Sequence, residues 1–375
     1  MSASGLTAVA MSGGLDSSVT ALLLARAGEP VVGLSMLLWE HSGEPAHGRC
    51  CGALDLGDAR RVAQQIGIPH YTLRMDEEFR AKVVDPFVQD YLAGRTPSPC
   101  VSCNTWIKFD RLLAKARAFG AETVATGHYA RILEGPDGPE LHTGLDAEKD
   151  QSYYLFELTR EQLAASRFPL GEMRKGQVRA LAREAGLVVA GKGESMEVCF
   201  VAGGVGDFVE HQVAQHPERY AAPEATEPAA VVTAEGRSLG AASAPYYRYT
   251  VGQRRGLGVA GIERLYVIGI EPEANRVTVG SEENLLSPGL VGERLHWIGD
   301  PERLAGPGGE VRATVKIRSR HPGVEATVRP LPEGQAEILF DQPQRGVAPG
   351  QAAVFYRGSR VLGGCWIRAS LPPHS

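Results

Sequence analysis

The sequence predicts an α/β protein whose parallel sheet occupies the first half of the chain, followed by a small central β-rich domain and a C-terminal antiparallel β-barrel. In the first half, short apolar runs alternate with segments of helical period. A glycine-rich turn joins the first apolar run to the first helical segment. From residue 230 onward the runs are short, and turn residues separate them at regular spacing, as in small barrels.

The first half supplies the elements of a parallel sheet. Strand–helix alternation is typical of such sheets, and their ligands bind beyond the carboxyl ends of the strands. We therefore expect residues 12–18, Met36, Gly127 and His128 to lie along one edge of the sheet. The expected strands are residues 6–11, 31–36, 70–73 and 123–126, and the expected helices include 55–66, 109–119 and 175–185.

Helical periods fade in the second half, apart from residues 207–215. Residues 217–228 are rich in Pro, Ala and Glu, which predicts an exposed connecting segment. These changes predict three domains, with boundaries at 1–204, 205–284 and 285–375. The expected strands are 230–233, 246–251, 266–271 and 276–280 in the central domain, then 310–317, 324–328, 336–340, 352–356 and 361–367.

The composition is that of an ordinary globular protein, with 43% hydrophobic and 22% charged residues among 375. No apolar run approaches the roughly 20 residues that span a bilayer, and no cationic leader precedes the first strand. We expect a cytoplasmic protein with no membrane partner. Because the formal net charge is −5, any nucleic acid must be held by local basic patches.

The glycine-rich turn is residues 12–18, SGGLDSS. Two glycines allow backbone N–H groups and the helix N-terminus to face an anion, and the hydroxyls of Ser12, Ser17 and Ser18 add donors. No Gly-Lys-Ser/Thr follows, which excludes a Walker-type phosphate loop. The competing interpretation is an ordinary helix capped by Asp16 or Ser17. The complete turn resembles the PP-loop of the ATP pyrophosphatases, which adenylate an oxygen of a second substrate.

Three cysteines stand out: Cys100 and Cys103 in a proline-rich loop, and Cys199 far downstream. They fit a packing role, a zinc or iron–sulfur site, or persulfide chemistry in which one cysteine carries sulfur and another resolves it. Spacing alone does not separate the last two.

The remaining cysteines suggest less. Cys50 and Cys51, with His41 and His47 upstream, could be taken for a zinc site, but adjacent cysteines serve one tetrahedral metal poorly. We expect these cysteines to pack. Cys365, at a glycine-rich strand end, is expected to be structural.

Beyond the turn, the chain resembles the tRNA-specific 2-thiouridylases along nearly its whole length. Six blocks in the same order carry the resemblance: residues 96–109 (TPSPCVSCNTWIKF), 125–131 (ATGHYAR), 149–155 (KDQSYYL), 194–201 (ESMEVCFV), 249–258 (YTVGQRRGLG) and 361–364 (VLGG). The family implies ATP-dependent replacement of the C2 oxygen of the tRNA wobble uridine by sulfur.

The resemblance also implies roles for the cysteines. Cys199 would receive sulfur from a persulfide donor protein and attack the activated carbon. Cys103 would release the sulfur and leave a Cys103–Cys199 disulfide. Many relatives have Asp where this chain has Cys100, which weakens a carboxylate acid/base role there. It strengthens a second scheme, a [4Fe-4S] cluster held by Cys100, Cys103 and Cys199.

The resemblance further assigns ATP, with Mg²⁺, to the edge of the sheet. Asp16 would orient the loop or help to place the metal. The expected nucleotide contacts are Ala10, Met11, Ser12, Gly13, Gly14, Leu15, Asp16 and Ser17 at the phosphates, Met36 at the adenine, and Gly127.

The expected tRNA contacts combine resemblance with charge. Arg312, Lys316, Arg318 and Arg320 have even spacing, which predicts one face of a strand; the competing interpretation is a solvated face. Arg254 and Arg255 form a second basic point. By resemblance, Ser98, Pro99 and Cys100 lie beside the target base, and further tRNA contacts come from His128, Lys149, Asp150, Gln151 and Gln351. The competing interpretation of His128 is a packed or capping residue at a strand end. Arg318, from the basic pattern, and its neighbour Ser319 are further candidates.

Two other functions fit parts of the sequence. Another adenylating enzyme, joining an amine to a carboxylate, would use the same loop but need no cysteine pair. A non-catalytic RNA-binding metal protein would use the cysteines but leave residues 12–18 without a role.

Overall fold

The computed structural model describes residues 5–39, 53–193, 198–201, 203–221, 226–258, 264–300, 302, 306 and 309–372. The chain divides into two compact units. The first contains Met1–Val84, Pro99–Val201 and Ser359–Leu362, and the second contains Asp85–Ser98, Ala202–Gly358 and Gly363–Ser375. In the part of the chain described, no helix is both long and apolar enough to cross a membrane.

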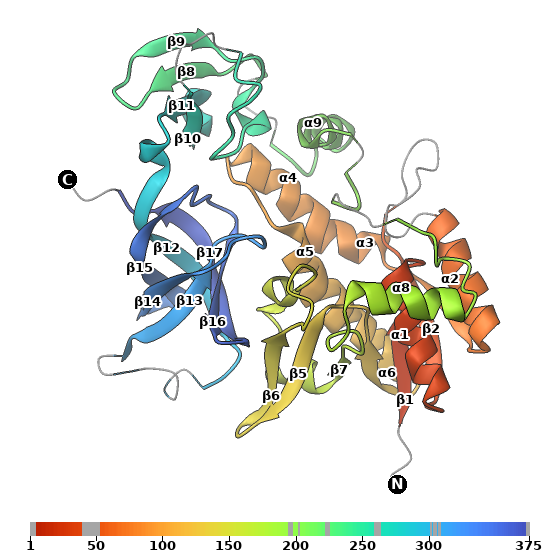
Figure 1. The fold of residues 1–375 in the computed structure, drawn as a ribbon. Helices are drawn as coiled ribbons and strands as arrows, with labels where there is room; N and C mark the ends of the chain where they lie inside the picture. The colour runs from red at the N-terminus through yellow and green to blue at the C-terminus, as the bar shows by residue number, and fades with distance from the viewer. Residues whose placement is uncertain are drawn as a thin grey trace. The chain divides into compact units, whose positions relative to one another are not determined.

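The first unit is built on a five-stranded sheet in the order β3-β2-β1-β4-β7, and every neighbouring pair is parallel (Figure 1). The four expected strands are confirmed to within about two residues, the usual uncertainty of strand ends, and β7 is an additional short edge strand. The bounds are β1 Leu6–Ala10, β2 Val31–Leu37, β3 His70–Arg74, β4 Ala121–Ala125 and β7 Ser166–Arg167.

Helices α1, α2 and α8 share one apolar core with β1, to which Val9, Val19, Val62 and Val178 contribute. The expected helices at 55–66 and 175–185 are confirmed. The expected helix at 109–119 is the end of a longer segment that begins as a π-helix. The bounds are α1 Leu15–Arg26, α2 Ala53–Ile66, α3 Asp76–Phe79, η1 Arg80–Val84, α5 Pro99–Ser102, η2 Cys103–Arg111, α6 Leu112–Ala118, η3 Ser152–Leu155, α7 Arg160–Ala164 and α8 Lys175–Glu184.

An antiparallel hairpin, β5 Ala130–Gly135 with β6 Gly138–Thr143, follows β4. The sequence analysis missed it. The signal was present, because Asp137-Gly138 is a hairpin-type dipeptide, and Gly138 has a φ of +110°.

The second unit contains two β-structures and two helices. A four-stranded sheet has the order β10-β11-β8-β9, and six further strands close into an antiparallel barrel because β12 pairs with both β15 and β17. The central β-rich sheet and the C-terminal barrel are therefore confirmed. The bounds are α4 Asp85–Leu92, α9 Val205–Gln215, β8 Ala230–Thr233, β9 Ser238–Ala241, β10 Tyr266–Glu271, β11 Arg276–Gly280, β12 Leu286–Trp297, β13 Val311–Lys316, β14 Val324–Leu331, β15 Gln335–Arg345, β16 Ala352–Arg357 and β17 Arg360–Ser370.

The strand expected at residues 246–251 was wrong. The structure has a 3-10 turn there, η4 Tyr246–Arg248. Tyr246 and Tyr247 are consecutive and both buried, which a strand with one solvated face does not allow. Their hydroxyls donate to the Leu92 carbonyl and to Glu210, so tertiary contacts decide the local conformation. The first barrel strand, β12, was not predicted.

Candidate active site

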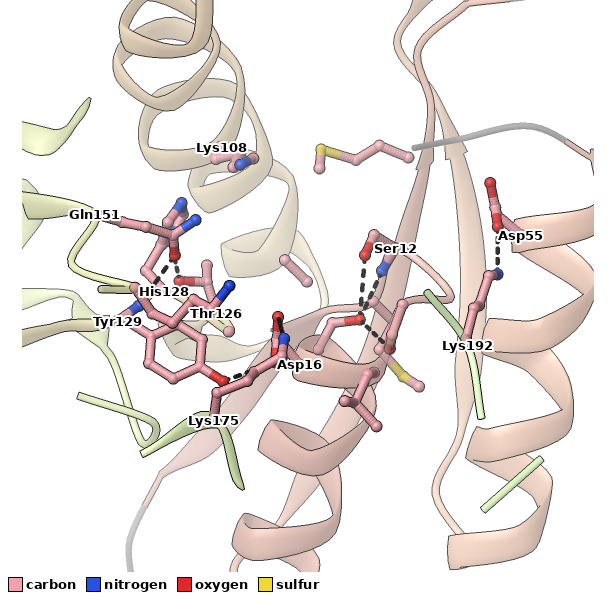
Figure 2. Close-up of a pocket in the computed structure, with 18 of the residues that line it drawn as sticks. Ser12, Asp16, Asp55, Lys108, Thr126, His128, Tyr129, Gln151, Lys175 and Lys192 are labelled. Atoms are coloured by element: carbon pink, nitrogen blue, oxygen red, sulfur yellow. Dashed lines mark hydrogen bonds and ion pairs between the residues drawn. The ribbon is translucent and has the colours of Figure 1, made fainter. Parts of the chain in front are cut away.

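A cavity of 310 Å³ lies at the carboxyl edge of the parallel sheet, within the first unit (Figure 2). Because β1 pairs in parallel with both β2 and β4, the segments that follow these strands meet at this edge. Nine of the ten expected nucleotide contacts line it: Ala10, Met11, Ser12, Gly14, Leu15, Asp16, Ser17, Met36 and Gly127. The tenth, Gly13, does not line the cavity; it lies against the backbone of Asp55 in α2.

Hydrogen bonds between Ser12 and Ser17 fix the conformation of the loop after β1. Ser17 Oγ accepts a hydrogen bond from the Ser12 backbone N–H at 3.2 Å, and the two serine hydroxyls lie 3.2 Å apart. Gly14 is the extended residue before α1, and no side chain caps this helix. The first-turn N–H groups of a helix without a side-chain cap are available to an anion. The capping roles considered for Asp16 and Ser17 were therefore wrong.

Ser18 does not contribute to the cavity, contrary to the expectation that it would supply a donor. It is fully buried, and its hydroxyl donates to the Gly14 carbonyl at 2.8 Å. Within α1, the Ser18 side chain is directed back to the helix backbone and away from the cavity. The seven residues of the turn are too few to predict this direction from periodicity.

Two glycines permit close backbone approaches around the loop. Gly13 has a φ of +72°, and a Cβ there would lie 1.9 Å from the Asp55 carbonyl oxygen. A Cβ on Gly127 would lie 2.8 Å from the Asp16 carbonyl carbon and 2.9 Å from the Ser17 nitrogen. Only glycine fits either position. The loop is thus enclosed between α2 on one side and the end of β4 on the other.

Asp16 is held by two groups from other elements. Lys175 Nζ donates to both carboxylate oxygens at 2.8 and 2.7 Å, and the Tyr129 hydroxyl donates to one at 2.9 Å. Lys175 also lies over the Tyr129 ring. Because both oxygens already accept hydrogen bonds, these contacts favour an orienting role for Asp16 over a metal-binding one.

The cavity carries an excess of positive charge. Among the described residues, its lining includes two aspartates, Asp16 and Asp55, and four lysines, Lys108, Lys149, Lys175 and Lys192. A partly enclosed site with this balance attracts polyanions. The sequence analysis selected only Lys149. The other three lysines have no motif around them and could not be found from spacing.

His128 opens onto the cavity although it is only 8% exposed. Its Nδ1 shares a 2.6 Å hydrogen bond with the Thr126 hydroxyl, and its ring packs against Phe109 and Phe168. Burial, reinforced by the charge of Lys108, holds the pKa of His128 well below its ordinary 6.5. The imidazole is therefore neutral, and Nε2 has no hydrogen-bond partner among the described residues.

Cys103 begins the π-helix that carries Lys108 to the cavity. In a π-helix hydrogen bonds join residues five apart, so Lys108 follows Cys103 by one turn. Lys108 Nζ donates to Asn104 Oδ1 at 2.9 Å, and Asn104 Nδ2 donates to the Tyr154 carbonyl at 3.0 Å. These bonds attach the Cys103 helix to η3.

Cys199 is held near the end of β2 by its neighbour. Phe200 is buried and packs on Phe79 and Trp39, with ring centroids 5.6 and 6.3 Å apart. Trp39 comes shortly after β2, and Arg80 lies over its ring. Both Cys103 and Cys199 are half-buried, whereas Cys100 is exposed. None of the three lines the 310 Å³ cavity.

The described residues contain no group of three His, Cys, Asp or Glu side chains placed to hold a metal. Cys100, Cys103 and Cys199 are all described, so the arrangement does not fit the iron–sulfur cluster. His41, His47, Cys50 and Cys51 lie outside the described residues, as do residues 194–197 of the Cys199 block. Cys365 is buried in β17, as expected, and burial raises the pKa of its thiol.

The expected tRNA contacts fall in several places. His128, Lys149 and Gln151 line the cavity. Asp150 does not; its carboxylate accepts hydrogen bonds from the backbone N–H groups of Gly144 and Ser152.

The segment just before the loop expected beside the target base belongs to the second unit, as does Gln351. Gln351 Nε2 donates to the Thr96 carbonyl at 2.8 Å, just before the buried Ser98. Pro99 is buried at the start of α5, and Cys100 follows it.

The four basic residues after residue 310 do not form one strand face. β13 ends at Lys316, and Arg318 lies beyond it in a turn with Ser319 and Arg320. Arg312 is neutralised by both oxygens of Asp341, at 2.7 Å each. That acid comes from β15, which the local sequence could not show. Arg318 is exposed, donates to the Arg345 carbonyl, and makes no ion pair with a described residue.

The fold and the site together define an α/β protein with a glycine-rich loop and a lysine-lined cavity at the edge of a parallel sheet. Three family models match successive parts of the chain. They are described as "tRNA methyl transferase HUP domain" for residues 6–203, "tRNA methyl transferase PRC-barrel domain" for 221–281 and "Aminomethyltransferase beta-barrel domain" for 287–367.

Curated relatives match nearly end to end. The tRNA-specific 2-thiouridylase MnmA of Solibacter usitatus (strain Ellin6076) is 48% identical over 96% of this chain and 98% of its own. The tRNA-specific 2-thiouridylase MnmA of Geobacter metallireducens (strain ATCC 53774 / DSM 7210 / GS-15) is 49% identical over 97% of this chain and 96% of its own. The chain belongs to the tRNA-specific 2-thiouridylase family. A solved 4-thiouridine synthetase–RNA complex with bound ATP matches 57% of this chain and 52% of its own chain, at 16% identity and a TM-score of 0.33.

Replacing Gly127 with Ala should weaken ATP binding by about tenfold or more, since overpacking of a close contact costs about 1–3 kcal/mol. The added methyl group meets the backbone of Asp16 and Ser17. Calorimetric titration with ATP and Mg²⁺ measures the effect. Gly57→Ala is the control, because a Cβ at Gly57 in α2 meets nothing within 4 Å. Its ATP affinity should equal that of the wild type; equal affinities for all three proteins would contradict the prediction.

Replacing His128 with Gln should flatten the acid side of the stability profile. Below pH 6.5 the unfolded chain binds a proton at this histidine that the native protein excludes. The native state therefore loses up to about 1.4 kcal/mol per pH unit, until the pH reaches the lowered native pKa. Urea unfolding of wild type and variant at pH 7, 6 and 5 tests this. Parallel profiles would show that burial does not disfavour the charged imidazole.

Proposed function

We propose that this protein catalyses ATP-dependent 2-thiolation of the wobble uridine of tRNA. The observation that carries the proposal is the lysine-rich cavity, in which the glycine loop, Met36 and Gly127 meet His128, Lys149 and Gln151. One cavity thus joins the residues expected at the nucleotide with three of those expected at the tRNA. Relatives named as tRNA-specific 2-thiouridylases cover nearly the whole chain.

The first step would be adenylation. The uracil C2 oxygen attacks the α-phosphorus of ATP, pyrophosphate leaves, and the N3 proton is lost. A carbonyl oxygen is a poor leaving group, whereas AMP departs readily. The loop N–H groups and the surrounding lysines would stabilise the charge on the phosphates, and positioning would supply much of the remaining acceleration. Mg²⁺, when bound with ATP, would neutralise further phosphate charge.

The second step would be sulfur transfer. A donor protein would leave a persulfide on Cys199, whose outer sulfur attacks C2 and displaces AMP. Cys103 thiolate then attacks the Cys199 sulfur, so that the outer sulfur leaves with the base as 2-thiouracil and a Cys103–Cys199 disulfide forms. Two cysteine sulfurs are oxidised and the transferred sulfur is reduced, which balances the electrons. A thiol reductant must then restore the enzyme.

The iron–sulfur scheme and the non-catalytic alternative have weaker support. The described residues hold no group suited to a metal, and a purely RNA-binding protein would not need the enclosed loop at Gly13 and Gly127. The persulfide scheme uses Cys103 at the start of η2, the helix that carries Lys108, and Cys199, whose neighbour Phe200 packs on Trp39 after β2.

Incubation of the protein with tRNA, ATP, Mg²⁺ and a persulfide source should produce 2-thiouridine, detected by mass spectrometry of the digested nucleosides. Cys199→Ser should abolish this product and retain tRNA-dependent release of AMP or pyrophosphate. Cys365→Ala is the matched control and should thiolate like the wild type, because Cys365 is buried in the barrel. Absence of both pyrophosphate release and 2-thiouridine would refute the proposal. ATP turnover that yields no 2-thiouridine and is unchanged in Cys103→Ser and Cys199→Ser would favour the amide-forming alternative.

Charge reversal at Arg318 should weaken tRNA binding about tenfold and reduce its salt dependence by about one phosphate contact, while ATP affinity stays unchanged. Arg318 is exposed and makes no ion pair with a described residue, whereas Arg312 is already paired with Asp341. Filter binding at several salt concentrations would compare Arg318→Glu, Arg318→Gln and Arg312→Gln. The Arg312 variant should change affinity least; the reverse order would show that Arg318 lies outside the RNA-binding surface.

A further inference from the structure

Lys192 is placed unlike the other lysines of the cavity. Its ammonium donates to the Gly13 carbonyl at 2.9 Å, to Asp58 at 2.7 Å and to Asp55. It reaches the loop from a segment almost 180 residues away in sequence, while Asp55 and Asp58 lie one turn apart on α2. Figure 2 shows the Lys192–Asp55 pair beside Ser12, on the side away from Lys175. Among the described cavity lysines, Lys192 is therefore the one hydrogen-bonded to the backbone of the glycine turn, whereas Lys175 contacts the Asp16 side chain.

Lys192 is shared between two aspartates beside the loop, and Asp58 also accepts a hydrogen bond from Arg61 on α2. Burial opposes the charged ammonium, but the hydrogen bonds to Asp55 and Asp58 outweigh it and keep the pKa of Lys192 above its ordinary value. The lysine is therefore charged at neutral pH. A polyphosphate that enters this loop meets the Asp55 carboxylate in the cavity lining, with Asp58 behind it, and the Lys192 ammonium joins both carboxylates to the Gly13 carbonyl.

We infer that Lys192 binds the pyrophosphate portion of ATP, and that Asp55 and Asp58 hold its ammonium beside the loop until the nucleotide arrives. The inference rests on the proposed use of ATP by this loop. An ammonium already at the Gly13 carbonyl needs only a small side-chain rotation to donate to a phosphate oxygen bound by the adjacent N–H groups. Asp55 lines the cavity and Asp58 does not, so the lysine can keep Asp55 as a partner and exchange Asp58 for phosphate.

This arrangement predicts opposite effects for the two partners of one ion pair. Removing the ammonium removes a charge-assisted hydrogen bond to phosphate. Removing the Asp58 carboxylate frees the lysine and takes away a repulsive charge. A lysine whose role is only to attach α2 to the loop predicts instead that both changes weaken binding, because both break the same bridge.

Titration calorimetry with the full chain and Mg²⁺, in the absence of tRNA, tests the inference with ATP, inorganic pyrophosphate and AMP as probes. Lys192→Gln should bind ATP and pyrophosphate roughly ten- to a hundredfold more weakly, the usual cost of a hydrogen bond to a charged group, and bind AMP like the wild type. Asp58→Asn should bind ATP as tightly as the wild type or more tightly. Lys115→Gln is the matched control, a lysine of α6 that pairs with Glu78 away from the cavity.

Each outcome separates the inference from the proposed function. A wild-type protein that binds neither ATP nor pyrophosphate overturns both. Normal wild-type binding with unchanged affinities in Lys192→Gln overturns only the role of Lys192. Equal losses of affinity for AMP and for ATP in Lys192→Gln would show that Lys192 does not act on the pyrophosphate portion. Equal weakening by Asp58→Asn and Lys192→Gln, with both proteins folded by circular dichroism, assigns the lysine a purely structural role.

Discussion

The missing side chains of Gly13 and Gly127 are the constraint on which the site depends. Each lies against the backbone of another segment at a distance that no Cβ tolerates. The loop after β1 is consequently held between α2 and the end of β4, with its N–H groups facing the cavity. Backbone donors fixed in this way need no reorganisation when an anion binds, which is the condition for strong electrostatic stabilisation.

The charged groups of the cavity follow from the position of that loop. Asp16, in the first turn of α1, is held by Lys175 and Tyr129, and Asp55 beside Gly13 is held by Lys192. Each acid that could repel a polyanion therefore has a lysine hydrogen-bonded to it. With Lys108 and Lys149 also in the lining, the site remains positive overall in a protein whose formal net charge is −5.

Cys103 and Cys199 do not line the nucleotide cavity, but they belong to the same compact unit. Cys103 begins the helix that brings Lys108 to the cavity, and Cys199 is followed by Phe200, which packs where β2 ends. In the proposed reaction, the nucleotide groups and the thiols would be supplied by different segments of the first unit. The neutral His128, buried between Phe109 and Phe168, adds a polar group without adding a charge.

The sequence alone determined four strands of the parallel sheet, the glycine turn and five of the six barrel strands, because period-2 and helical patterns and glycine placement are local properties. It also located nearly all of the loop residues that line the cavity. The tertiary structure decided what no local pattern records: Lys108, Lys175 and Lys192 join the site from separate segments, and Asp341 of β15 neutralises Arg312 of β13. It also turned residues 246–248 into a 3-10 turn, because buried tyrosine hydroxyls needed partners on other helices. Long-range ion pairs and hydrogen bonds depend on which segments meet, and spacing along the chain carries no information about that.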